Sequence, residues 1–127
     1  MGGAILMVDD EPHIRALLLQ TLEDLEDEGV ELLTASDGEQ AMAMIAEHRP
    51  DLVLLDVLLP ELDGYAVCRA VRADPGLDGV RIVLLTAKGR DADREQGLQA
   101  GADDFRTKPF DPDEILSLAR ARLGLDG

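Results

Sequence analysis

The sequence predicts an α/β fold in which a parallel sheet is covered by helices on both faces. Apolar runs of strand length alternate five times with segments of helical pattern. The runs at 52–55 and 80–85 are apolar or nearly so, as in strands buried on both faces. Repeated strand–helix units form parallel sheets with right-handed crossovers, so all five strands are expected to end at one edge of the sheet.

Composition limits the class of protein. The chain has 127 residues, the size of one domain, and we expect residues 1–127 to form it, with a short tail after about residue 123. Hydrophobic residues make up 46% but aromatic residues only 2%, so the core must consist of Leu, Val, Ile, Ala and Met. The net charge of −15, with 12 scattered basic residues, disfavours direct nucleic-acid binding by this chain.

The N-terminal apolar run is too short to span a membrane. It is interrupted at Asp9, which also disfavours a signal peptide. The single Cys68 can form no internal disulfide, as is typical of proteins in a reducing compartment. We therefore expect a cytoplasmic protein without a membrane anchor.

The first strand is predicted at 4–8, and it leads directly into Asp9. A helix then begins at Pro12, a first helical position where the missing N–H costs nothing. We expect this helix to continue to Gly29. Its inward stripe is predicted to be Ile14, Leu18, Leu22 and Leu25.

The second strand, at 30–35, alternates between apolar and polar residues, which indicates a place near the sheet edge. Residues 37–40 resemble a capping box, so the second helix begins there and ends at Pro50. The residues expected to be buried in this helix are Ala41, Met44 and Ile45.

The third strand, at 52–56, is the clearest buried strand and delivers Asp56 at its end. A third helix is expected over 64–73, where it is broken by the sequence at 74–76. Its inward residues are predicted to be Val67, Ala70 and Val71.

The last part of the chain holds two more strands and two more helices. The strand at 80–85 leads into Thr86, and a weak helix over 91–100 follows, with Gly97 inside it. A polar strand at 102–107 reads as an edge strand. The last helix begins at Asp111-Pro112, an N-cap followed by Pro, and is expected to end near Leu123.

Polar side chains follow four of the predicted strands at the shared edge. They are Asp9 and Asp10, Asp56, Thr86, and Lys108. Three carboxylates at close range repel one another unless a cation lies between them. Oxygen ligands suit a hard divalent ion, so we expect Mg²⁺ here, with Mn²⁺ as an alternative.

Lys108 and Thr86 suit a tetrahedral anion, one through its charge and the other through its hydroxyl. Asp56 is the candidate nucleophile, because aspartyl phosphate is an established covalent intermediate. Taken singly, each of these residues has an ordinary structural explanation as a helix cap, a turn acid, a strand-end hydroxyl or a surface charge. Those explanations do not account for the joint occurrence of these residues at the ends of four of the five strands.

Five stretches with these residues make the chain resemble the receiver domain of bacterial two-component response regulators. The matching stretches are 5–12, 51–56, 59–64, 83–87 and 101–110. The resemblance covers essentially the whole chain. The resemblance implies a flavodoxin-like (βα)5 three-layer sandwich, with a central five-stranded parallel sheet of order 2-1-3-4-5.

The resemblance also implies a function. Asp56 would be the phosphoacceptor, receiving a phosphoryl group from a sensor histidine kinase or a histidine phosphotransfer protein. Asp10, Asp56 and the backbone carbonyl of Leu58 would hold Mg²⁺, and Asp9 would act through water. The chain would then be a signalling switch rather than an enzyme with a turnover substrate.

Further roles come with the same resemblance. Thr86 and Lys108 would contact the phosphoryl group, and the Lys108–Pro109 peptide bond would be cis. Phe105 would be the switch aromatic, turning inward as Thr86 moves toward the phosphate. The surface around the fourth helix and the fifth strand would change as a result.

Three departures from the family pattern qualify these expectations. Phe105 stands where many relatives have Tyr, so the switch cannot use a phenol hydroxyl. Leu118 stands where relatives that dimerise through the fourth and fifth helices often have Arg, so we expect a monomer or a weak dimer through the fourth helix, fifth strand and fifth helix. Leu58 and Lys88 stand where an acid or amide would orient a hydrolytic water, so self-dephosphorylation is expected to be slow.

The same residues disfavour three other functions. A phosphatase of the haloacid-dehalogenase type needs an acid two residues after its nucleophile, where this chain has Leu58. Flavin binding would need a hydroxyl-rich phosphate loop, and Asp9 and Asp10 would repel the phosphate. A phosphorylation-independent interaction domain typically loses the acid pair, the Thr or the Lys, and this chain keeps them all.

Overall fold

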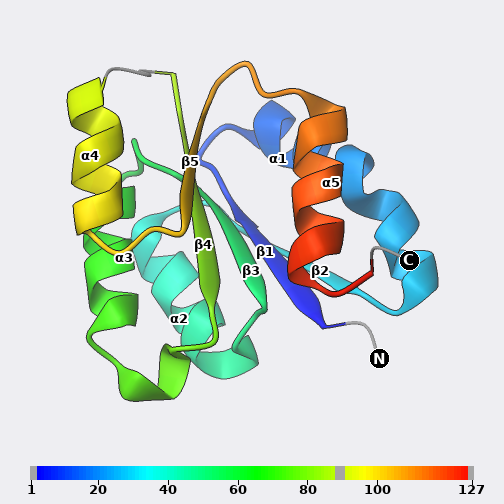
Figure 1. Ribbon diagram of the computed structural model, residues 1–127, viewed down its shortest axis with the longest axis horizontal. Coiled ribbons are helices and arrows are strands. Elements are labelled where there is room, and N and C mark those ends of the chain that lie inside the picture. The colour runs from blue at the N-terminus through cyan, green and yellow to red at the C-terminus, as the bar shows by residue number, and fades with distance from the viewer. Residues whose placement is uncertain (1–2, 88–90, 126–127) are drawn as a thin grey trace.

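The protein is a three-layer α/β sandwich around one parallel sheet (Figure 1). The computed structural model describes residues 3–87 and 91–125. The strands are β1 (Ala4–Val8), β2 (Glu31–Ala35), β3 (Leu52–Asp56), β4 (Arg81–Thr86) and β5 (Asp104–Thr107). The helices are α1 (Pro12–Leu22), α2 (Gly38–His48), α3 (Gly64–Arg72), α4 (Asp91–Gln99) and α5 (Pro112–Arg122), with short 3₁₀ segments at η1 (Glu23–Glu28) and η2 (Pro75–Leu77).

The strand order is β2-β1-β3-β4-β5, with every neighbouring pair parallel. This confirms the predicted order and places β2 and β5 at the two edges. Helices α1 and α5 lie on one face of the sheet, and α2, α3 and α4 lie on the other (Figure 1). Since all strands are parallel, their carboxyl ends share one edge, as expected.

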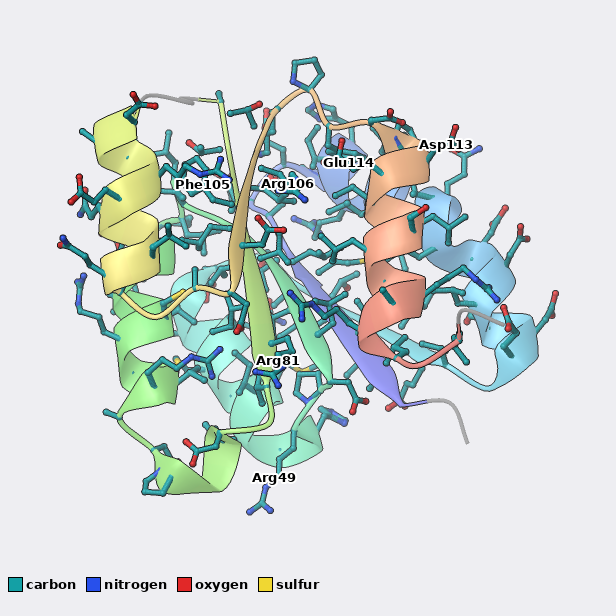
Figure 2. The ribbon with its side chains drawn as sticks, viewed as in Figure 1. Arg49, Arg81, Phe105, Arg106, Asp113 and Glu114 are labelled. Atoms are coloured by element: carbon teal, nitrogen blue, oxygen red, sulfur yellow. The ribbon has the colours of Figure 1, made fainter. Side chains whose placement is uncertain are left out.

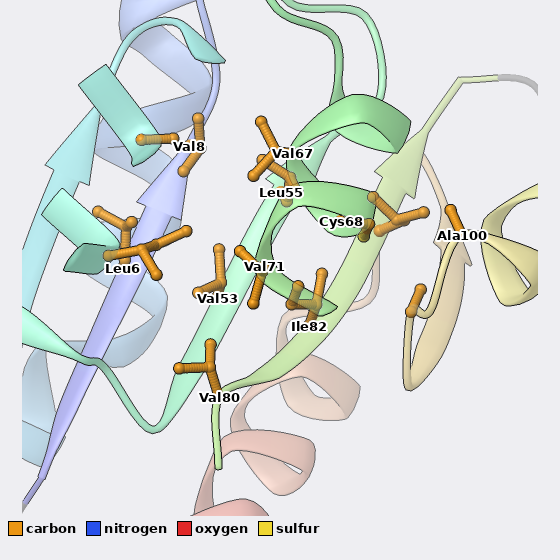
Figure 3. Close-up of a cluster of buried hydrophobic side chains, with 14 of the residues drawn as sticks. Leu6, Val8, Val53, Leu55, Val67, Cys68, Val71, Val80, Ile82 and Ala100 are labelled. Atoms are coloured by element: carbon orange, nitrogen blue, oxygen red, sulfur yellow. The ribbon is translucent and has the colours of Figure 1, made fainter. Parts of the chain in front are cut away.

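Two hydrophobic layers fill the space between the sheet and its helices. Alternate residues of β1 and β3 point into opposite layers, so both strands are fully buried. Figure 3 shows the larger layer, where Leu6, Val53 and Val71 pack between the sheet and the helices on that face. Strands buried on both faces are what the continuous apolar runs predicted.

Two expectations about the helices were wrong. The first helix ends at Leu22, and residues 23–28 form a 3₁₀ segment before Gly29 takes a left-handed conformation. Leu25 is still buried, because a residue three positions after Leu22 also faces inward in a 3₁₀ turn. Ala70 is exposed, since a rotation of about 100° per residue turns it away from the face that carries Val67 and Val71.

The start of α2 also differs in detail from a capping box. Asp37 caps the helix as predicted, and its carboxylate accepts the backbone N–H of Gln40 at 2.7 Å. The Gln40 side chain, however, accepts from the N–H and hydroxyl of Ser36, one residue before the cap. None of the helices in the described part of the chain has the length and apolar character that crossing a bilayer requires.

Candidate functional site

The carboxyl ends of the strands open into a cavity of about 310 Å³. Loops after β1, β3, β4 and β5 build its walls. The lining residues are Asp10, Glu11, Asp56, Leu58, Ala87 and Lys108. In a parallel sheet, this edge at the point where strand order reverses is where ligands bind.

Three carboxylates meet at this edge. Asp9 and Asp10 follow β1, Asp56 ends β3, and one oxygen of each lies within 4.8 Å of the others. Asp9 is fully buried and Asp56 is 5% exposed, whereas Asp10 is open to solvent. The ends of β1 and β3 thus place two buried acids, Asp9 and Asp56, next to one solvent-exposed acid, Asp10.

Lys108 joins two of these acids. Its ammonium donates to Asp9 Oδ2 at 2.7 Å and lies 3.4 Å from Asp56 Oδ2. Burial lowers the pKa of Lys108, but the hydrogen bond to Asp9 and the charge of Asp56 outweigh it, so the net pKa is raised. Lys108 therefore stays charged at neutral pH and holds a positive charge beside the acids.

The site disfavours the ionised form of Asp56. Burial raises the pKa of its carboxyl to about 6, and the charge of Asp9 adds to this, while Lys108 and the Leu58 N–H act in the opposite direction. The Leu58 N–H donates to Asp56 Oδ1 at 3.3 Å. Without a cation the site is thus short of positive charge, and one lysine does not compensate for two buried acids.

Asp9 is held at three points. Its Oδ1 accepts the Glu11 N–H at 2.9 Å, its Oδ2 accepts from Lys108, and its backbone carbonyl accepts from Arg15 at 2.7 Å. Arg15 was not singled out in the sequence. Its place near the start of the helix that follows the acid pair was the available signal.

A glycine lets α3 begin directly against the end of β3. Gly64 N–H donates to the Val57 carbonyl at 2.9 Å, and a Cβ at position 64 would lie 2.5 Å from the Asp56 carbonyl oxygen. Val57 N–H in turn donates to the Leu85 carbonyl at 3.0 Å. The backbone around Asp56 is therefore fixed between β4 and the first turn of α3.

Thr86 ends β4 and is buried, and its carbonyl accepts the Lys108 N–H at 2.7 Å. This bond ties the ends of β4 and β5 together. The Lys108–Pro109 peptide bond is cis. Lys88, to which the sequence assigned a part in phosphoryl lifetime, lies outside the described residues.

Phe105 is buried in the larger hydrophobic layer, against α4. Figure 2 shows it on the side of β5 that faces α4, while Arg106 points to the side that faces α5. The Arg94 guanidinium lies 6.0 Å from the centre of the Phe105 ring. Phe105 thus links the strand that carries Lys108 to the helix beside it.

The donor set fits a hard divalent cation. It consists of the clustered carboxylate oxygens of Asp9, Asp10 and Asp56, and the cavity beside them leaves space for water. Soft ligands are missing from this cluster, since no His or Cys belongs to the acidic group found among the described residues.

Comparisons with known proteins agree with this geometry. The profile of the response regulator receiver domain family matches residues 5–120. The DNA-binding response regulator MtrA of Mycolicibacterium smegmatis is 47% identical over 123 residues, which are 97% of this chain and 51% of that protein. The chain therefore spans about half the length of this curated relative.

Solved structures give the same result. A response regulator from Chloroflexus aurantiacus has 35% identity and a TM-score of 0.86, covering 98% of this chain and 99% of that one. The receiver domain of a sensor histidine kinase from Pseudomonas aeruginosa, solved with a magnesium ion in its active-site cleft, has 35% identity and a TM-score of 0.83, covering 98% and 99%. With its fold, its acidic cluster and this match, the chain belongs to the receiver domain family of two-component response regulators.

Proposed function

We propose that this chain accepts a phosphoryl group on Asp56 from the phosphohistidine of a sensor kinase or phosphotransfer protein. The observation that carries the proposal is the pairing of Lys108 with both Asp9 and Asp56 at the wall of an open cavity. A lysine held at this point can contact a phosphoryl group on Asp56 without leaving its place. The transfer would occur in the cytoplasm, and nucleic acid would not be contacted by this chain.

The reaction is an in-line displacement at phosphorus. A carboxylate oxygen of Asp56 forms the new P–O bond as the bond between phosphorus and the donor's imidazole nitrogen breaks. The donor's imidazole, which carries a proton on its other ring nitrogen, keeps the bonding electron pair and leaves as a neutral ring, so the protein need not supply a proton. Lys108 and Thr86 contact the phosphoryl oxygens, one by charge and the other by its hydroxyl.

A divalent cation, Mg²⁺ or alternatively Mn²⁺, would supply the missing positive charge beside these oxygens. Asp10, Asp56 and the Leu58 carbonyl would hold it. Asp9 would act through water, because both of its carboxylate oxygens already accept hydrogen bonds. Asp10 is the exposed member of the triplet, which supports a direct contact.

The test uses acetyl phosphate as the donor and intact mass as the readout. The wild type should gain the mass of one phosphoryl group in the presence of Mg²⁺ and none in excess EDTA. Asp56→Asn is the control for the phosphoacceptor, and Asp10→Ala should lose the Mg²⁺-dependent labelling. Labelling of Asp10→Ala at the wild-type rate would overturn the metal assignment, and labelling of Asp56→Asn would overturn the phosphoacceptor.

We also propose slow loss of the phosphoryl group. Leu58 is 59% exposed at the cavity wall and has no side-chain acceptor to orient an attacking water. Reset would then depend on a partner phosphatase or on back-transfer to a histidine. Leu58→Asn should shorten the lifetime of the label in purified protein, and a wild type that clears its label within seconds would contradict the proposal.

The output surface would be the region of α4 and β5, in a monomer or a weak dimer. Arg106 lies 2.7 Å from Asp104 and 2.5 Å from Glu114 of its own chain. These charges are thus already paired within one copy, and Leu118 provides no cation for a neighbour. Sedimentation of the beryllofluoride-treated protein is expected to show at most weak association.

A further inference from the structure

The first turn of α3 is packed against two functional regions of the molecule. Gly64 touches the backbone of the phosphoacceptor strand end, as its hypothetical Cβ shows. The next residue, Tyr65, is 9% exposed and donates its hydroxyl to the backbone carbonyl of Asp93 at 3.2 Å. Asp93 lies in the first turns of α4. Gly64 and Tyr65 therefore connect the end of β3 with α4, a helix of the proposed output surface.

The first half of α4 buries little apolar surface. Within α4, which the structure describes throughout, Gly97 is the one buried residue, and it lies in the second half of the helix. There the helix packs closely on Leu84 and Phe105. Residues 91, 92, 94, 95 and 96 are all exposed. The Tyr65 hydroxyl thus contacts the part of α4 with the least apolar burial.

The environment of Tyr65 supports a stable hydrogen bond. Burial raises the pKa of its phenol, and the nearby charges of Asp93 and Asp63 raise it further, so the hydroxyl keeps its proton at neutral pH. A buried Tyr hydroxyl normally requires such a partner. Phe at this position would keep the ring and lose only the donor.

We propose that Tyr65 is a conformational latch, whose hydroxyl holds the first half of α4 against α3 in the unphosphorylated protein. The latch rests on the proposed function for its purpose, since it would set how readily α4 shifts when Asp56 is phosphorylated. A displacement of the loop between β3 and α3 reaches Tyr65 through Gly64 without an intermediate element. The two positions of α4 then differ by whether this hydrogen bond is made.

Hydrogen exchange on Tyr65→Phe tests the latch without any phosphodonor. Amides of residues 95–97, which donate to carbonyls in the first turn of α4, are expected to exchange about three- to tenfold faster than in the wild type, the range for loss of one buried hydrogen bond. Thr21→Val is the matched control, because it removes another hydroxyl donor, from Thr21 to the Leu17 carbonyl, far along the chain from α4. Its α4 exchange should equal that of the wild type.

A second measurement uses the wild type itself. Tyr65 is the only tyrosine and the chain has no tryptophan, so the intrinsic ultraviolet fluorescence reports this residue alone. Beryllofluoride with Mg²⁺ should change that signal and should remove the difference in α4 exchange between wild type and Tyr65→Phe. Equal α4 exchange of the two proteins before beryllofluoride is added would overturn the latch. Failure of acetyl phosphate to label the wild type would instead overturn the proposed function. The latch would still be tested by the exchange comparison between wild type and Tyr65→Phe, which needs no phosphodonor.

Discussion

Helices α4 and α5 flank the edge strand β5, yet the protein holds them in different ways. Helix α5 buries Ile115 and Ala119 in the layer that it shares with α1. It is also joined to η1, because Arg120 lies 2.5 Å from Glu28. Helix α5 is therefore held by apolar burial first and by surface charges second.

Helix α4 presents the opposite case. Its one buried residue is a glycine, and its large apolar side chain, Leu98, is 49% exposed. Its contacts with the rest of the molecule include the Tyr65 hydroxyl and the ring of Phe105. A helix with so little buried apolar area can move at low cost.

The difference between the helices is set by alternate residues of one strand. Phe105 points toward α4 and Arg106 toward α5, because successive side chains of a strand face opposite sides (Figure 2). Under the proposed function, a change at Lys108 or Thr86 would reach α4 through Phe105 while α5 stays in place. The comparison predicts a fixed side and an adjustable side of the same strand.

The largest expected effect is loss of apolar burial from α5. Ile115 is 1% exposed, so Ile115→Ala should lower the free energy of unfolding by about 3 kcal/mol. Leu98→Ala in α4 removes a side chain that is half in solvent and should cost less than about 1 kcal/mol. Urea denaturation of both variants measures the contrast, and equal losses would abolish the distinction between the two helices.

The next largest effect on stability is expected from the charge of Asp56, which lies at the carboxyl edge of the sheet. Its pKa is raised to about 6 in the folded protein, so this group favours folding when protonated. That stabilisation is complete below about pH 4 and is lost as the pH rises through about 6. Metal-free Asp56→Asn should therefore be more stable than the wild type by up to about 3 kcal/mol at pH 7.5, with the difference vanishing near pH 4.

Saturating Mg²⁺ is the control for the Asp56 prediction. Cation binding to the folded wild type should raise its stability at pH 7.5 and narrow the gap to Asp56→Asn. Melting temperatures of the wild type and Asp56→Asn, each measured with Mg²⁺ and with EDTA, give the stability gap with and without the cation. A gap that is constant from pH 4 to pH 7.5 would mean that burial of the Asp56 charge is not its cause.

Most of the fold could be predicted from the sequence, for a physical reason. Strands buried on both faces must be apolar throughout, so β3 and β4 were evident, and the alternating pattern placed β2 near an edge. The residues that follow these strands had to meet at one rim. The sequence alone therefore groups Asp9, Asp10, Asp56 and Lys108, and the structure brings them together.

Other features could not be predicted, because they depend on contacts between distant segments. Tyr65 and Asp93 are 28 residues apart, and no local pattern marks their hydrogen bond. The sequence predicts a helix up to Gly29, although α1 ends at Leu22, because Leu22 and Leu25 face inward in either an α-helix or a 3₁₀ turn. Local periodicity gives the face of a helix more reliably than its end or its partners.

A smaller effect is expected at Gly97, where α4 comes nearest to the sheet. A Cβ there would lie 2.9 Å from Leu84 Cδ1 and 3.2 Å from Phe105 Cδ2, and both side chains are buried. The crowding outweighs the better helix propensity of Ala, so Gly97→Ala should lose about 1 kcal/mol. Gly79→Ala, with nothing within 4 Å of its Cβ, is the control and should be nearly neutral. A Gly97→Ala protein as stable as the control would show that α4 already has room to move outward.

The smallest effect is expected from the ion pair on the fixed side. Arg106 lies 2.5 Å from Glu114, but the Glu114 side chain is 50% exposed, so water and salt weaken the attraction. Glu114→Gln should lower the free energy of unfolding by less than about 0.5 kcal/mol, and the difference should disappear at about 1 M salt. Urea denaturation at low and high salt measures it. Because Ile115 is buried directly beside Glu114 in the chain, α5 does not need the charge to stay in place. A loss as large as that of Ile115→Ala would reverse this order, and would make α5 a helix held by its charges.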